Sequence, residues 1–354
     1  MARRAQAPPE PRSQAGTSTP MIHPTPSGTR DVLPDEMREL REITERLRSV
    51  FEAAGYGEVY TPALEYESEL RPAGVSPAYR MFDAHGDVLV LRSDMTVPIA
   101  RVAATRYGGV APPLRFAYFA HAYRGVRAHR GQAREFLQAG IELIGSPAPE
   151  GTAEALAVLC AALDAVGLEG YRVGLGDAGL YPALLDGLGV PANVRGPLLH
   201  HLVMRDFVGV EREIARLGLD ADAAALLLRV PQTRGGPEAL EVAGEAVDGM
   251  RAVHALLAPG VAERVIFDLG LLRDLDYYTG AVFDVYDPAL GVPIGGGGRY
   301  DDLLGRFGRP LPAVGFALNV ERLHMALMGE ERGAGQGEAG GAAAGEESGA
   351  GPWE

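Results

Sequence analysis

The sequence of 354 residues contains one cysteine, Cys160. A single thiol excludes an internal disulfide framework and any metal site of the CxxC type. Cys160 lies in the helix-like run EALAVLCAALDAVG, where we expect a small core residue. The histidines also lack metal-ligand spacing with other donors, as seen for His121, His129, His200 and His201. We therefore predict no metal and no cofactor.

Long apolar runs and an excess of basic residues are also lacking. No stretch approaches the length that spans a membrane, and residues 1–20 have no apolar segment of the kind found in signal peptides. The simplest expectation is a cytoplasmic protein without a membrane partner. The 33 basic and 47 acidic residues give a net charge of −14. This balance disfavours non-specific binding to nucleic acid or anionic lipid.

The ends of the chain have low-complexity composition. Residues 1–21 are rich in Pro, Ala and Ser, which predicts a disordered leader, with Met21 as an alternative start to Met1. Residues 330–354 are rich in Gly, Ala and Glu, which predicts a disordered tail. The folded core is thus expected over residues 22–329. Helical runs broken by Gly and Pro over about 190–260 predict a helical insertion within it.

Residues 268–300 hold the features around which the core is organised. Side chains from Tyr278 to Tyr286 alternate between apolar and mixed faces, which predicts a strand, and four glycines, Gly295 to Gly298, follow on an expected neighbouring strand. Glycines let a ligand approach the backbone closely. A buried hairpin with a Gly-rich turn fits these residues equally well, so the rest of the chain has to decide.

Further elements are predicted on both sides of that stretch. Apolar spacing predicts an amphipathic helix over residues 35–54, stopped by Gly55. The segment GEVYTPALEY is expected to be an edge strand, because Pro62 has no amide donor. Paired strands are predicted over residues 114–125 and 135–145. In the second of them alternation places Gln138 and Glu142 on one face.

Several motifs carry a resemblance. They are GTRD at 28–31, LRSDMTVPIAR at 91–101, YRG at 123–125, REFLQAG at 134–140, LRDLDYY at 272–278, GGGRYD at 296–301 and AVGFALNVERL at 313–323. In this order they resemble the catalytic core of histidyl-tRNA synthetase, a class II aminoacyl-tRNA synthetase. The resemblance implies an α+β fold: an antiparallel sheet flanked by helices. It also implies a homodimer through the region of Pro62, which resembles the dimer-forming motif of the family.

Two kinds of protein share this core: the synthetase, and the synthetase-like regulatory subunit of ATP phosphoribosyltransferase. Departures from the synthetase pattern favour the second. Only the low-complexity tail follows Arg322, where a synthetase continues into an anticodon-binding domain. Val126 stands where the family has an acidic residue that reads adenine. Valine cannot accept a hydrogen bond from the adenine amino group, so bound adenine would leave its polar edge unpaired at a cost of about 1–3 kcal/mol. Asn319 replaces a glycine that packs beside the nucleotide in the family. In the run RSDMT at 92–96, where synthetases usually have RPEGT, Asp94 keeps the acid but shortens it.

The resemblance also implies a histidine pocket. Asp94, Thr96 and Gln138 would accept from the α-ammonium, and Arg273 would pair with the carboxylate. Glu142 and Tyr278 would address the imidazole. The candidate histidine-binding residues are therefore Asp94, Thr96, Arg124, Gln138, Glu142, Arg273, Tyr277 and Tyr278. Tyr277 ranks below Tyr278, because alternation points it to the opposite face.

Simpler interpretations exist for some of these residues. Arg124, Arg127, Arg130 and Arg134 also fit a solvated basic loop. Asp94 followed by Thr96 fits a helix N-cap that binds no ligand. Glu142 is harder to explain this way, because a carboxylate between core residues needs solvent, a partner or a polar pocket.

Two functions follow. In the first, the chain is a non-catalytic subunit that binds L-histidine and forms a hetero-oligomer with a short-form ATP phosphoribosyltransferase catalytic subunit. There it would support activity and convey feedback inhibition in the first step of histidine biosynthesis. In the second, it is an enzyme that activates histidine with ATP. The departures favour the first, and they predict no binding of tRNA.

Overall fold

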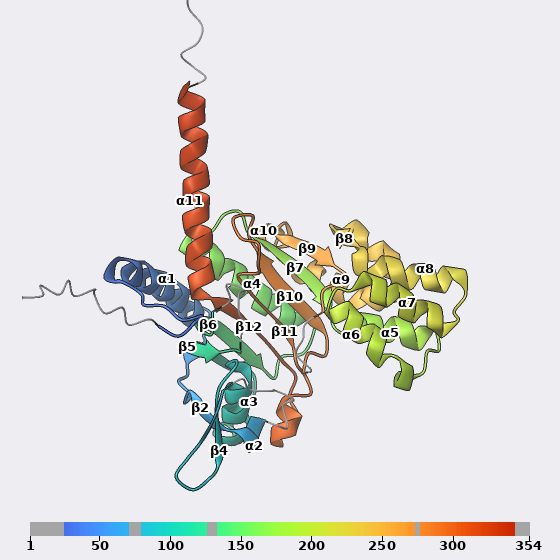
Figure 1. Cartoon of the computed structure of the whole chain (residues 1–354), viewed down its shortest axis with the longest axis horizontal. Helices are drawn as coiled ribbons and strands as arrows, with labels where there is room; N and C mark the ends of the chain where they lie inside the picture. The colour runs from blue at the N-terminus through green and yellow to red at the C-terminus, as the bar shows by residue number, and fades with distance from the viewer. Residues whose placement is uncertain (1–24, 71–78, 126–132, 273–276, 344–354) are drawn as a thin grey trace, which may run out of the picture.

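The computed structural model describes residues 25–70, 79–125, 133–272 and 277–343 of the chain (Figure 1). The leader predicted over residues 1–21 lies outside this range, as do residues 344–354 of the predicted tail. Among the described residues no helix is both long and apolar enough to cross a membrane.

A nine-stranded sheet forms the centre of the molecule, in the order β1-β5-β6-β12-β11-β10-β7-β9-β8. In that order the strands are Gly57–Glu58, Leu114–Tyr123, Glu135–Ile144, Ala313–Asn319, Gly295–Arg299, Ala281–Tyr286, Arg172–Asp177, Val265–Asp268 and Arg234–Gly235. The six strands from β5 to β7 are antiparallel, as predicted. The pairs β1–β5 and β7–β9 are parallel, so the sheet is mixed near both edges. Long crossover segments join the strands of each parallel pair, which is what parallel pairing requires.

Three helices cover one face of this sheet: α1 (Pro34–Ala53), α4 (Glu150–Val166) and α11 (Val320–Ala343). The helix predicted over residues 35–54 is confirmed as α1. It buries Leu40, Ile43, Leu47 and Phe51 at spacings of three or four, and Gly55 follows its end with a left-handed φ of 84°. Its apolar face thereby joins the main hydrophobic core with the side chains of β6, β10 and β12.

The opposite face meets a smaller unit. Its three-stranded sheet has the order β2-β4-β3, with β2 at Leu64–Tyr66, β4 at Val88–Leu91 and β3 at Arg80–Phe82. Helices α2 (Glu67–Leu70) and α3 (Thr96–Thr105) and the 3-10 helix η5 (Leu304–Phe307) accompany it. The predicted edge strand around Pro62 proved to be two strands, β1 and β2, each at the edge of its own sheet. Pro62 separates them because it has no amide hydrogen for a ladder.

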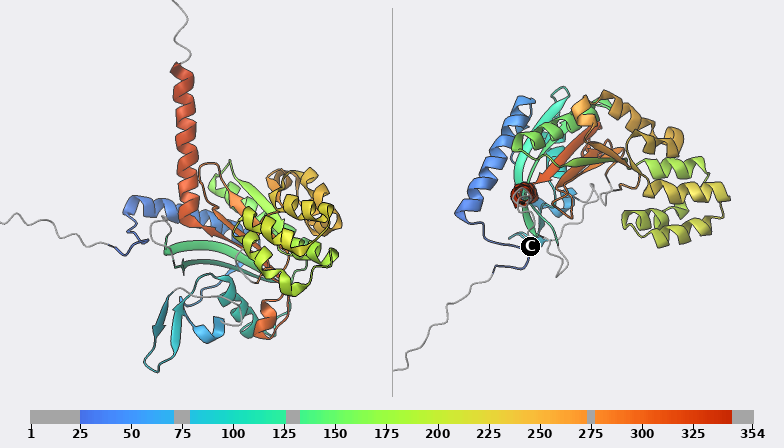
Figure 2. Two further views of the ribbon diagram at one scale, coloured as in Figure 1. Left: turned by 45° about the vertical axis from the view of Figure 1, so that its right-hand side comes forward. Right: turned by 90° about the horizontal axis from the view of Figure 1, so that it is seen from above.

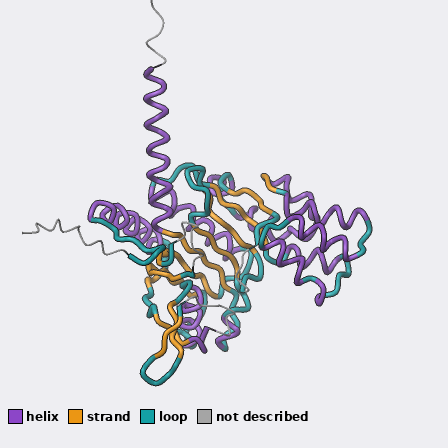
Figure 3. The backbone as a smooth tube through the Cα atoms, viewed as in Figure 1, coloured by secondary structure: helices purple, strands orange, loops and turns teal. Residues whose placement is uncertain are grey.

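The predicted helical insertion stands to one side of the sheet (Figures 2 and 3). It contains η2 (Ala192–Val194), α6 (Gly196–Val203), α7 (Phe207–Leu217), α8 (Ala221–Arg229), η3 (Val230–Gln232), η4 (Pro237–Val247) and α9 (Asp248–Leu256). Helix α5 (Leu180–Gly187) leads into it, and α10 (Pro259–Ala262) leads back to β9. Between η3 and η4 the two residues of β8 pair with β9 at the edge of the large sheet.

Helix α11 continues past the predicted end of the folded core at residue 329. It runs to Ala343, whereas composition predicts a disordered tail from residue 330. Its first turns are anchored by buried Val320, Leu323 and Ala326. Extending an existing helix costs far less than starting one, so an anchored helix can extend into Ala- and Glu-containing sequence.

Candidate functional site

Glu142 of β6 is the centre of the candidate site. Its side chain is 1% exposed, and it is bonded by hydroxyl groups from two other segments. Thr96 Oγ1 at the start of α3 donates to Glu142 Oε1 over 2.8 Å, and the Tyr300 hydroxyl after β11 donates to Oε2. Gly315 of β12 pairs with Glu142 in the sheet. A Cβ at Gly315 would lie 1.8 Å from Glu142 Oε2, so this glycine makes room for the carboxyl group.

The environment of Glu142 changes its protonation. Burial raises the pKa of the Glu142 carboxyl to about 8, against the opposing hydrogen bonds from Tyr300 and Thr96. The negative charge of Asp94 raises that pKa further. At neutral pH the Glu142 carboxyl is therefore mainly protonated. A ligand that brings an N–H donor or a positive charge would favour the carboxylate.

Asp94 and Thr96 lie where α3 meets the site, and the two have different roles. Asp94 Oδ1 accepts from the Val97 amide at 3.1 Å, so Asp94 caps α3 as the simpler interpretation proposed. Asp94 is also buried, which raises its pKa, and its charge acts on Glu142. Thr96 contacts Glu142 directly. The cap interpretation thus explains Asp94 in part and does not explain Thr96.

Gln138 offers an unused acceptor on the same face of β6. It is 6% exposed, and its Oε1 atom has no hydrogen-bond donor in the part of the chain that the structure describes. Four residues of strand separate it from Glu142, roughly 13 Å along the backbone. A buried acceptor without a donor costs free energy until a donor arrives. An ammonium group is one donor that would satisfy it.

Tyr277 and Tyr278 lie side by side, with ring centroids 4.9 Å apart. The prediction that they point to opposite faces of a strand is wrong, because β10 begins only at Ala281 and alternation does not apply before it. Tyr277 is buried, and its ring centroid is 5.9 Å from that of Tyr300. Tyr278 packs on Gly298, where a Cβ would lie 2.8 Å from the ring. This glycine therefore makes room for a tyrosine.

Sequence reasoning missed two tyrosines of the site, Tyr300 and Tyr118. The Tyr118 hydroxyl donates to the Phe316 carbonyl at 3.3 Å, and burial, followed by the charge of Glu142, raises its pKa well above the usual range. Tyr300 ends the GGGRY run, so its motif was visible in the sequence. The contact between Tyr300 and Glu142 was not visible in the sequence, because β12 lies between β6, which carries Glu142, and β11, which Tyr300 follows.

Arg124 lies at the rim of the site. It is exposed, its Nε donates to the Ser93 carbonyl at 3.2 Å, and its guanidinium lies 5.2 Å from the ring centroid of Phe136. Its positive charge lowers the pKa of buried Asp94, opposing the effect of burial. Arg124 therefore contributes an electrostatic influence on the site.

Other predicted features have different outcomes. Arg134 donates to the Ser27 carbonyl at 2.6 Å and to the Tyr79 hydroxyl at 2.9 Å, so a freely solvated loop is wrong for this residue. Asn319 Oδ1 accepts from the Arg322 amide at 2.8 Å, which places its side chain at the start of α11. Arg273, Val126, Arg127 and Arg130 lie outside the described residues.

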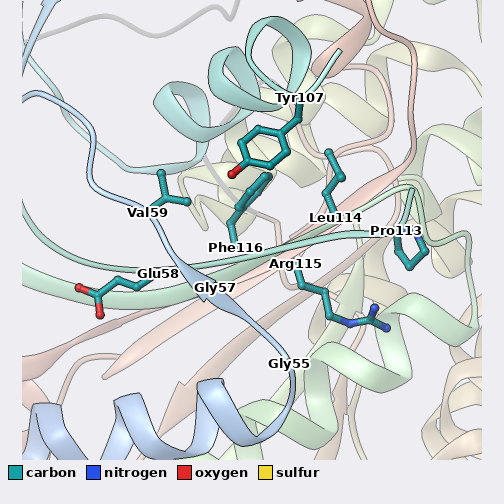
Figure 4. Close-up of a pocket in the computed structure, with 9 residues that line it drawn as sticks. All are labelled: Gly55, Gly57, Glu58, Val59, Tyr107, Pro113, Leu114, Arg115 and Phe116. Carbon is teal, nitrogen blue, oxygen red and sulfur yellow. The ribbon is translucent and has the colours of Figure 1, made fainter. Parts of the chain in front are cut away.

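The site holds no cluster of metal ligands: nowhere in the described ranges do three or more His, Cys, Asp or Glu side chains gather around one point. A cavity of about 290 Å³ lies instead at the edge of the large sheet (Figure 4). Its lining comes from Gly55 before β1, from β1 itself and from the start of β5, with Gly57, Arg115 and Phe116 among the residues. It shares no residue with the predicted site.

Comparisons with known proteins agree with one another. The pattern that defines the histidyl-tRNA synthetase family matches residues 28–323. A protein of Symbiobacterium thermophilum named "ATP phosphoribosyltransferase regulatory subunit" is 42% identical over 91% of this chain and 84% of its own length. A protein of the same name from Desulforamulus reducens is 40% identical over 85% of this chain and 78% of its own length.

Solved structures place the chain in the same group. A Bacillus halodurans structure titled as an ATP phosphoribosyltransferase regulatory subunit/histidyl-tRNA synthetase superposes with a TM-score of 0.80 at 33% identity. The match covers 87% of this chain and 84% of that one. Histidyl-tRNA synthetase from Nostoc sp. PCC 7120 superposes with a TM-score of 0.71 at 23% identity, over 87% of this chain and 76% of that one, and shows the shared fold.

Proposed function

The chain belongs to the ATP phosphoribosyltransferase regulatory subunits, which have the histidyl-tRNA synthetase fold, and from this membership we propose its function. It is a subunit without catalytic activity of its own, and its partner is the catalytic subunit of an ATP phosphoribosyltransferase. Sequence identity to proteins of that name over most of both chains carries this conclusion. We further propose that the partner is the short-form catalytic chain of histidine biosynthesis, and that this subunit supports its activity and conveys inhibition by histidine.

L-Histidine is the ligand that we propose for the Glu142 site. The unpaired Gln138 Oε1 supports a ligand with an ammonium group, and buried Glu142 supports one with a ring N–H. Arg273 is proposed from the resemblance alone to bind the carboxylate. These three groups would recognise the three polar parts of one small amino acid.

Calorimetry with histidine and histidinol tests this assignment. Histidinol has no carboxylate, so it would leave the cation that pairs with that group unsatisfied. A charge-assisted hydrogen bond contributes about 1.5–3 kcal/mol, so histidine should bind at least about tenfold more tightly. Equal affinity for the two compounds would contradict the proposed carboxylate contact.

Assembly with the catalytic chain is tested by mixing the two purified proteins. Phosphoribosyl-ATP formation is assayed with and without histidine, and the mixture is analysed by size exclusion. We expect a stable complex with higher activity than the catalytic chain alone. Histidine must then bind the inhibited arrangement more tightly, by a coupling of typically about 1–3 kcal/mol. A catalytic chain that is equally active and equally histidine-sensitive alone, with no complex, would refute the regulatory function.

The competing function is histidine activation with ATP. The synthetase fold favours it, and Val126 in place of the adenine-reading acid disfavours it. Histidine-dependent pyrophosphate exchange by the purified chain decides between them, and appreciable exchange would reinstate the enzyme. Filter binding of histidine tRNA at physiological salt should show no specific complex, as the net charge of −14 suggests.

We also propose that the protein is cytoplasmic and forms a homodimer through the region of Pro62. Large apolar side chains are exposed on this segment and on the small sheet that follows it. Tyr60 is 82% exposed, Leu64 and Tyr66 of β2 are 44% and 49% exposed, and Phe82 of β3, the other edge strand of that sheet, is 74% exposed. Such surfaces often mark interfaces. Light scattering should give the mass of a dimer, and Tyr60→Ser should weaken it. A monomeric wild-type protein would contradict the proposal.

A further inference from the structure

A second cavity, of about 530 Å³, lies between α3, α2 and η5. Arg101, Thr105 and Arg106 line it from the end of α3, and Arg306 and Phe307 line it from η5. Glu69 of α2 completes the wall. None of these residues belongs to the histidine site. We call this cavity the arginine pocket.

The charges of the arginine pocket are unusual for this chain. Three arginines and one glutamate line it, although acidic residues outnumber basic ones by 47 to 33 overall. Arg101 is compensated by buried Glu65, to which it donates over 2.8 Å. Exposed Arg106 forms no ion pair or side-chain hydrogen bond within the described part of the chain. Arg106 therefore brings a positive charge without an ion-pair partner among the described residues to this concave site.

Helix geometry does not account for Arg106. Cations are favoured at a helix C-terminus, where backbone carbonyl groups lack partners. Arg309 already has that role for α3: its guanidinium donates to the Ala103, Tyr107 and Val110 carbonyls. Arg106 makes no such contact, so stabilisation of α3 gives no reason for a further arginine there.

We propose that the arginine pocket binds a small molecule that carries a phosphate or pyrophosphate group. Guanidinium groups match phosphate oxygens with paired hydrogen bonds, and Arg106 and Arg306 reach the cavity from different elements. Phe307 offers an apolar wall for the rest of the ligand. The volume lies in the usual range for small-molecule sites, about 300–1,000 Å³. An acidic protein segment would more naturally use a flat basic surface.

Titration of the full chain with inorganic pyrophosphate and with ATP, at an ionic strength of about 0.15 M, tests the proposal. Arg106→Ala should weaken pyrophosphate binding about tenfold or more, since it removes a charge-assisted contact. Arg41→Ala is the matched control, because Arg41 is an exposed helical arginine of α1 outside the cavity. Arg124→Ala is a second control, because Arg124 lies at the rim of the Glu142 site and not in the arginine pocket. Both of these variants should retain wild-type pyrophosphate affinity.

Three results would overturn the proposal. The first is no pyrophosphate or ATP binding by the wild-type chain. The second is binding that survives Arg106→Ala and is lost in Arg124→Ala, which would place the anion at the rim of the histidine site. The third is an Arg106→Ala variant that binds pyrophosphate normally and fails to assemble with the catalytic chain, which would make the arginine pocket a protein contact. Histidine affinity serves as the folding check, because Arg106 lies outside that site.

Discussion

Replacing Glu142 with glutamine should separate the stability of the protein from its function. Glutamine has the shape of glutamic acid and remains neutral at every pH. Its amide still accepts a hydrogen bond, and the Thr96 and Tyr300 hydroxyls can each donate or accept, so both contacts have counterparts in the variant. What Glu142→Gln removes is the ability of this buried position to become charged.

The magnitude follows from the pKa of Glu142. Burial raises it from an ordinary value of 4.5 to about 8, so the folded state holds the proton more tightly than the unfolded state. The stability contributed by the bound proton is complete below the unfolded value and is lost as the pH rises through about 8. The free energy of unfolding of the wild type should therefore fall with pH across that window. The whole effect is on the order of 5 kcal/mol.

Urea unfolding at several values between about pH 5 and pH 8 measures this dependence. Glu142→Gln should show a flatter profile and exceed the wild type in stability near pH 8. Calorimetry should show the opposite for function, because the imidazole N–H loses a charged acceptor. We expect histidine affinity to fall about ten- to a hundredfold.

Glu154→Gln is the matched control. Glu154 accepts from Arg115 and Tyr56, and although partial burial opposes it, these bonds lower the pKa of Glu154. Its titration therefore falls below the pH window of Glu142. The control should keep the wild-type fall in stability from pH 5 to 8 and the wild-type histidine affinity. If Glu142→Gln also keeps that fall, a different group titrates there and the account of the site is wrong.

Two further substitutions test the packing of the sheet and of α11. Gly315→Ala should displace the Glu142 carboxyl, cost about 1–3 kcal/mol of stability and weaken histidine binding measured by calorimetry. Gly109→Ala is the control and should change neither stability nor binding, because a Cβ at Gly109 would meet open space. Unchanged histidine affinity in Gly315→Ala would contradict the placement of Glu142. Asp287→Asn should stabilise the protein by about 1 kcal/mol at pH 8 and so raise its thermal midpoint, because Asp287 Oδ2 is buried without a donor among the described residues, and an amide there can donate to neighbouring Glu330. A lower thermal midpoint would count against this.

Much of the fold was readable from local patterns. Alternating side chains predicted β5, β6 and β10, and a spacing of three or four predicted α1 and its end at Gly55. These periods follow from covalent backbone geometry, which every short segment carries by itself. The same geometry placed Gln138 and Glu142 on one face of β6. The motifs likewise indicated the family without any knowledge of the tertiary structure.

Contacts between distant segments were decided only by the tertiary structure. Tyr300 lies 158 residues from Glu142 and Thr96 lies 46 residues from it. They meet because β6, β12 and β11 pair in one register while α3 packs against β6. Register depends on how the whole core packs, so no local pattern reveals it. The raised pKa of Glu142, the parallel pairs β1–β5 and β7–β9 and the gathering of arginines around one cavity have the same origin. Each depends on which distant segments the fold brings together.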